Sequence, residues 1–120
     1  MSSFDLDLDV LLSGVSPPIA ALAREVVALV ASVRPDFKAK VAFGWSRVLF
    51  RHPRHGFICS VVPGRDRVLL MFQDGRLLDS PLLEDDGKVV KVRWLAFLPG
   101  EVLPVDDIAI LLAESIALRG

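Results

Sequence analysis

The chain has 120 residues, a hydrophobic share of 52 % and a formal net charge of −1. A chain of this size can bury a real core without disulfides or a structural metal, and its single cysteine excludes an internal disulfide. Its purely apolar runs are far shorter than the roughly 20 residues of a membrane span, so we expect no transmembrane helix. Asp5, Asp7 and Asp9 stand where a secretory signal needs basic residues, and we therefore expect a cytoplasmic protein.

The first regular element is expected over residues 17–34. Apolar residues recur there at three- and four-residue spacing from Ile19 to Val33, which predicts a helix with one apolar stripe. Ser16 can cap the free amides, and Pro17 suits the first helical position. Pro35 disfavours a helical conformation at the residue before it, so the helix should end there.

The next part of the chain changes to a period of two and predicts strands. Apolar and charged residues alternate over 37–43, and later segments rich in β-branched and aromatic residues are separated by Gly and Pro turns. The stretch 76–87 is expected to be a loop. The predicted strands are 37–43, 47–52, 56–62, 67–73 and 89–97.

The last element is a helix from Pro104 to Arg119, with Asp106 and Asp107 in its first turn, where carboxylates suit the positive helix end. The order is helix, four- to six-stranded antiparallel meander, helix, which predicts an α+β two-layer sandwich. A meander cannot cover itself, so both helices should pack on one face and leave the other partly open. We expect a single domain over 17–120, preceded by an N-terminal extension over 1–16.

Several short segments resemble one family. They are FGW at 43–45, VLF at 48–50, LMF at 70–72, KVR at 91–93 and, most specifically, GRLLDSPLLEDDGK at 75–88. Over about residues 17–118 the chain resembles the YdhG-like family of small bacterial and archaeal proteins, most of which have no assigned function. The resemblance implies a frataxin-like fold and, as a further step, a function in iron delivery. Frataxin-type iron handling uses a dense acidic ridge, and the corresponding region here offers only Glu25 and Asp36.

Two acidic clusters are candidates for binding a hard cation. Asp5, Asp7 and Asp9 alternate with leucines, so an extended segment would point three carboxylates the same way. The positions that an EF-hand loop needs for Gly and Glu are not matched. We therefore predict a flexible or edge segment with solvated charges, and a solvated loop for the second cluster, 84–86.

His52, His55 and Cys59 are the other candidates for metal ligation or for a nucleophile pair. A structural zinc site needs a fourth ligand, and no CxxC or HExxH pattern is present. Nothing supplies an orienting group or an oxyanion hole for catalysis. We predict a hairpin with exposed histidines and a buried, inert thiol, with no catalytic residue, no metal ligand and no cofactor other than the iron that the resemblance suggests.

Charge is unevenly distributed along the chain. Residues 34–76 carry nine cationic side chains and three aspartates, a net charge of +6, which leaves −7 for the remainder. Such segregation predicts either ordinary solvated strand faces or a basic surface that attracts anions.

Alternation along the strands indicates where this basic surface should lie. Arg47, Leu49 and Arg51 share one strand face, and Lys91 and Arg93 share one face of the last strand. If the intervening residues of the last strand meet the helices, these cations lie together on the open sheet face. Such a surface can hold a phosphate, a carboxylate, an acidic partner or a nucleic-acid backbone.

The residues expected to meet the helices are Val90, Val92 and Trp94. Trp45 is expected either in the core or as a stacking aromatic of the basic surface. The candidate binding residues are therefore Trp45, Arg47, Arg51, Lys91 and Arg93.

The function predicted from these patterns is a small binding or interaction module, not an enzyme, whose partner is an unknown protein or an anionic ligand. An iron-binding chaperone of frataxin type and a nucleic-acid-binding protein are the alternatives. We expect no membrane partner and either a monomer or a homodimer.

Overall fold

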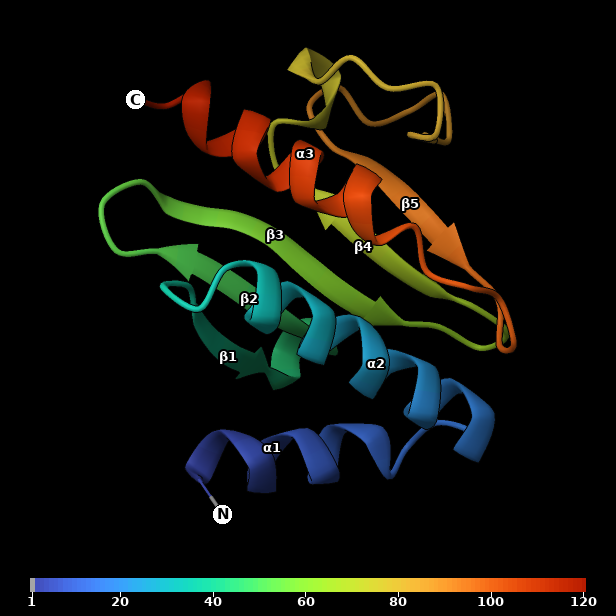
Figure 1. Ribbon diagram of the computed structural model, residues 1–120. Helices are drawn as coiled ribbons and strands as arrows, with labels where there is room; N and C mark the ends of the chain where they lie inside the picture. The colour runs from blue at the N-terminus through green and yellow to red at the C-terminus, as the bar shows by residue number, and fades with distance from the viewer. Residues whose placement is uncertain (1) are drawn as a thin grey trace.

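Five antiparallel strands form one sheet in the computed structural model, which describes residues 2–120 (Figure 1). The strands follow one another in the sheet in chain order, as expected for a meander. They are β1 (Lys38–Ala42), β2 (Arg47–His52), β3 (Gly56–Pro63), β4 (Val68–Phe72) and β5 (Arg93–Phe97). The helices are α1 (Ser3–Leu12), α2 (Pro17–Val33) and α3 (Val105–Ala117), with two short 3-10 turns, η1 (Phe43–Trp45) and η2 (Gly75–Leu77).

Helices α2 and α3 cover the same face of the sheet (Figure 1). Alternate residues of the strands face them, except at the bulge in β3, where the consecutive Ile58 and Cys59 are both in the core. The register keeps these residues in phase, for example Val48 opposite Val61 and Leu70 opposite Leu95. All four are buried in the core, together with the apolar stripe of α2 and that of α3. The prediction of an α+β two-layer sandwich, with an antiparallel meander between two helices, is confirmed.

The N-terminal segment was expected to be flexible or extended, and that prediction is wrong. Ser2 caps a helix there, because its side chain accepts from the backbone N–H of Asp5 while the Asp5 carboxylate accepts from the backbone of Ser2. Leu8 and Leu12, four residues apart, are buried in the core, where α1 packs beside β1. Helix α1 therefore belongs to the sandwich as a third helical element.

The last strand is shorter than predicted. It begins at Arg93, whose partner Phe72 is the final residue of β4, so a strand over 89–92 would have no neighbour to pair with. The chain over 86–89 is instead held in tight turns, where the Asp86 carboxylate accepts from the backbone N–H groups of Lys88 and Val89. The loop between β4 and β5 also pairs with the outer edge of β5, through two backbone hydrogen bonds between Glu84 and Trp94.

Within residues 2–120, no helix is both long enough and apolar enough to cross a bilayer.

Candidate functional site

The face of the sheet away from α2 and α3 carries a group of cations from the first two strands. Val48 and Phe50 point into the core, so Arg47 and Arg51 lie on the opposite, open face, as predicted. The pairing of β1 with β2 places two more cations on this face, because Lys38 lies opposite Arg51 and Lys40 lies opposite Leu49. In the described part of the chain no carboxylate forms an ion pair with any of these four side chains.

The other two predicted cations do not join this group. Arg93 pairs with the core residue Phe72, which places it on the helix side of the sheet, where it binds Asp85 (3.1 Å) and the carbonyls of Val90 and Val92. Lys91 lies exposed in the loop, and its carbonyl accepts from the N–H of Arg76. The prediction that Lys91 and Arg93 share the open face with Arg47 is therefore wrong.

The prediction that Val90, Val92 and Trp94 face the helices is wrong for the same reason. Trp94 pairs with Met71 and so lies on the open face, outside the main core, although it is buried. Val90 is exposed, and Val92 lines a hollow on the open face. None of the three residues meets the helices.

That hollow is a cavity of about 200 Å³ in the middle of the open face. Strand β2 supplies Arg47, and β3 supplies Phe57 and Ser60. Met71 of β4 lies beside Ser60 in the register and completes the floor. The remaining lining comes from Trp45, Gln73 and Val92.

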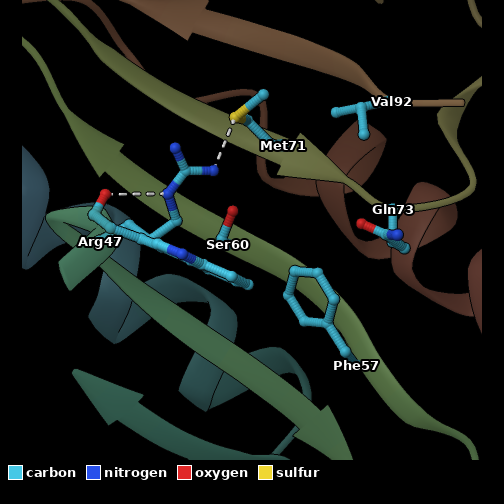
Figure 2. Close-up of a pocket in the computed structure, with 7 residues that line it drawn as sticks. Arg47, Phe57, Ser60, Met71, Gln73 and Val92 are labelled. Carbon is cyan, nitrogen blue, oxygen red and sulfur yellow. Dashed lines mark hydrogen bonds between the residues drawn. The ribbon is translucent and has the colours of Figure 1, made fainter. Parts of the chain in front are cut away.

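The guanidinium of Arg47 is held in place by neutral groups (Figure 2). Its Nε donates to the carbonyl oxygen of Trp45 at 3.2 Å, and one terminal nitrogen lies 3.7 Å from the Met71 sulfur. An arginine has five N–H donors, so three remain for a ligand. The side chain is half-buried and carries a full positive charge with no counter-ion from this chain among the described residues.

Ser60 supplies an unused hydroxyl to the cavity. The residue is only 1 % exposed, and its Oγ has no hydrogen-bond partner within residues 2–120. Every fully buried side-chain nitrogen or oxygen of these residues does have a partner. The Ser60 hydroxyl must therefore keep its small remaining access through the cavity that it lines, where it is ready to bond a ligand.

Trp45 stands on the open face and not in the core. Its side chain is 63 % exposed, because η1 turns the chain outward and ends at Ser46 in a left-handed conformation with φ 54°. A second hollow of about 220 Å³ lies against Trp45 and is lined also by Ala42, Gly44 and Leu49. The core position considered for Trp45 is wrong, and the stacking position stays a prediction.

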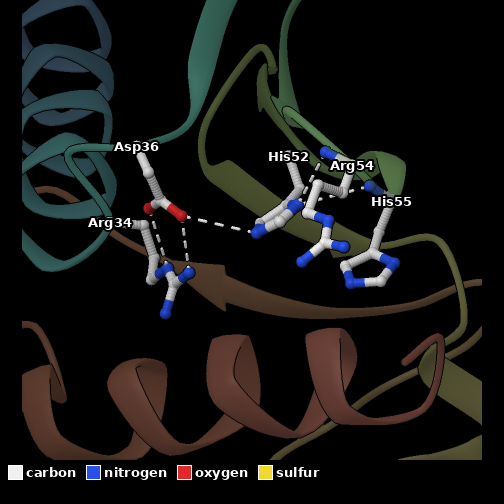
Figure 3. A network of polar contacts seen from close by, with 5 residues as sticks. All are labelled: Arg34, Asp36, His52, Arg54 and His55. Atoms are coloured by element: carbon white, nitrogen blue, oxygen red, sulfur yellow. Dashed lines mark hydrogen bonds and ion pairs between the residues drawn. The ribbon is translucent and has the colours of Figure 1, made fainter.

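The two histidines belong to a structural network at one end of β2 (Figure 3). The Nδ1 of His52 accepts the backbone N–H groups of Arg54 and His55, and its Nε2 faces Asp36 at 3.4 Å. The hydrogen bonds from Arg34 hold the pKa of Asp36 below its usual value. Both histidines are half-buried, so the prediction of exposed rings is wrong.

Cys59 is buried in the core, as predicted, and burial raises the pKa of its thiol. Such a thiol is a poor nucleophile and a poor metal ligand, because both roles need the thiolate.

The acidic clusters are also engaged locally. Asp9 pairs with Arg24 at 2.7 Å, and Asp5 caps its own helix, where hydrogen bonds from Ser2 lower its pKa. In the second cluster, Asp85 binds Arg93 and the N–H of Gly87. Over residues 2–120 no three side chains of His, Cys, Asp or Glu converge as a metal site would require.

Most of the cavity could not be predicted from the sequence. Phe57, Met71 and Gln73 have no distinctive local pattern. Ser60 does carry a signal, because it is the one polar side chain in the otherwise apolar stretch from Phe57 to Pro63. Lys38 and Lys40 could have been placed beside Arg47 and Arg51 by pairing the first two strands as a hairpin.

A scan against models of protein families found no match, and neither a search of curated proteins nor a search of solved structures found a significant one.

Proposed function

We propose that this protein is a small binding module that holds an anionic ligand on its open sheet face, in the cavity at Arg47. The observation that carries the proposal is a positioned guanidinium that lines a cavity and has no carboxylate partner among the described residues. Arginine presents N–H donors in a fixed, planar geometry that matches carboxylate and phosphate oxygens. An anion in this position would be the missing counter-ion.

The neighbouring cations support the same proposal. Lys38 and Arg51 lie directly opposite each other on the open face, and like charges in such a pair are unfavourable. Together with Lys40 they extend the positive charge of the open face along β1 and β2, from Arg51 at one end of the pairing to Arg47 at the other, and such a surface attracts anions. The lysines also protect the free edge of β1 from pairing with another chain.

The two alternative functions stay predictions. The iron chaperone is supported only by the YdhG-like resemblance, which itself stays a prediction. Nucleic-acid binding rests on the same cations and would show a steep loss of affinity with salt. The absence of enzymatic activity, the cytoplasmic location and the oligomeric state stay predictions as well.

The test is isothermal titration calorimetry with acetate, benzoate and inorganic phosphate at constant ionic strength. Arg47→Met removes the charge and keeps a long apolar stem, so we expect it to abolish saturable binding. Arg65→Met is the matched control, because Arg65 is an exposed, unpaired arginine in the turn between β3 and β4. If the two variants bind these anions equally, or if the wild type binds none of them, the proposal is wrong.

A further inference from the structure

The charges that line the cavity define the charge of its ligand, and the inference drawn from them rests on the proposed function. Arg47 is the only ionisable side chain of the lining. Arg51, whose register partner Phe57 lines the cavity, has one guanidinium nitrogen 3.7 Å from where a Cβ on Gly56 would stand, at the end of the β2–β3 hairpin. One half-buried positive charge is matched by one negative charge, which favours a carboxylate over a phosphate dianion.

The same lining selects against an ammonium group on the ligand. Within residues 2–120 no carboxylate lines the cavity, so the amino group of an amino acid would lose water and gain no charged partner. The ligand should therefore carry an acid group and no amine.

The walls of the cavity favour a ligand with a flat apolar ring. The indole of Trp45 and the ring of Phe57 provide aromatic faces, and Val92 provides an aliphatic one. The sulfur of Met71 on the floor suits contact with an aromatic ring. A volume of about 200 Å³ is below the 300–1,000 Å³ of sites for drug-sized ligands and suits a single ring.

The polar groups orient such a ligand. Figure 2 shows Ser60 between Arg47 and Phe57, in keeping with the register, which places Ser60 opposite Leu49 and Phe57 opposite Arg51. A carboxylate at Arg47 can accept two guanidinium N–H groups and the Ser60 hydroxyl, while its ring extends toward Phe57. We infer that the cavity binds small planar monocarboxylates without an amino group, with benzoate as the type compound.

The experiment compares five probes on the wild-type protein by calorimetry: benzoate, phenyl phosphate, phenylalanine, benzamide and cyclohexanecarboxylate. Benzoate should bind at least about tenfold more tightly than each of the others. Phenyl phosphate differs in the charge and shape of its anion, phenylalanine carries an amine, benzamide has no charge and cyclohexanecarboxylate has no flat ring. Saturation-transfer NMR should show the benzoate ring protons in contact with the protein. Ser60→Ala should weaken benzoate binding about threefold to tenfold, the effect of one hydrogen bond.

The outcomes separate this inference from the proposed function. If phenyl phosphate or phenylalanine binds as tightly as benzoate, and Arg47→Met abolishes that binding, the assigned ligand class is wrong and the anion site stands. If none of the probes binds in a manner that depends on Arg47, both fail. The ranking on the wild type decides the ligand class even if Ser60→Ala does not fold.

Discussion

The packing of α1 gives a sharp prediction of stability. Leu8 and Leu12 are 5 % and 3 % exposed, whereas Leu6 on the same helix is 54 % exposed. Truncating a buried leucine to alanine typically costs about 2–5 kcal/mol, through lost burial and the cavity that remains. Because α1 lies at the β1 side of the sandwich, where its surroundings can partly collapse, we expect about 2–3 kcal/mol for Leu8→Ala and for Leu12→Ala.

The measurement is urea unfolding followed by far-ultraviolet circular dichroism, with the free energy of unfolding extrapolated to water. Leu6→Ala is the matched control, and its change should stay within about 0.5 kcal/mol, as for an ordinary surface position. Equal free energies of unfolding for all three variants would show that α1 is not docked in solution, and the extended N-terminal segment would then be the better description.

Three further predictions concern other parts of the fold. Gly75→Ala should cost about 1–3 kcal/mol, because a Cβ there would lie only 2.5 Å from Arg93, whereas Gly44→Ala, with nothing within 4 Å, should change the urea midpoint little. The lowered pKa of Asp36 stabilises the fold above pH 3.8, and this stability is lost as pH falls through the folded-state pKa. Asp36→Asn should therefore flatten the dependence of the urea midpoint on pH in that range. An unchanged dependence would contradict this. Cys59 should react with a thiol reagent only after denaturant is added, and rapid labelling of the native protein would show that it is not buried.

Local periodicity predicted the elements whose apolar residues have only one possible arrangement. The stripe from Ile19 to Val33 fits a helix alone, and the alternation over 37–43 fits a strand alone. The N-terminal stretch FDLDLDVLL is ambiguous, because its alternation fits a strand while Leu8 and Leu12 also share one helix face. Capping by Ser2 and Asp5 decides in favour of the helix, and alternation alone does not reveal that capping.

The last strand was misread because both of its faces are apolar. Trp94 and Ala96 alternate with Leu95 and Phe97, so the sequence does not show which pair meets the helices. The answer depends on the loop before this strand, which pairs Glu84 with Trp94 at the outer edge of β5. Loop contacts of this kind are tertiary and leave no periodic pattern in the chain.

Only the part of the site that lies within one strand could be predicted from the sequence. Alternation placed Arg47 on the open face, but the cavity needs residues from three strands and a loop. Their meeting depends on the register between strands and on the irregularity between Phe50 and Arg51, which shifts β3 relative to β2. Neither is encoded by the spacing of residues within one segment.

The central claim is that an anion binds at Arg47 on the face opposite α2 and α3, and nitrogen-15 NMR during a titration with benzoate tests it directly. The account predicts saturable shifts of the Arg47 side-chain Nε–H, the Trp45 indole N–H and the backbone amides of Ser60 and Met71, with none in Arg47→Met. Shifts that map instead to the helical face, or that persist unchanged in Arg47→Met, would contradict it.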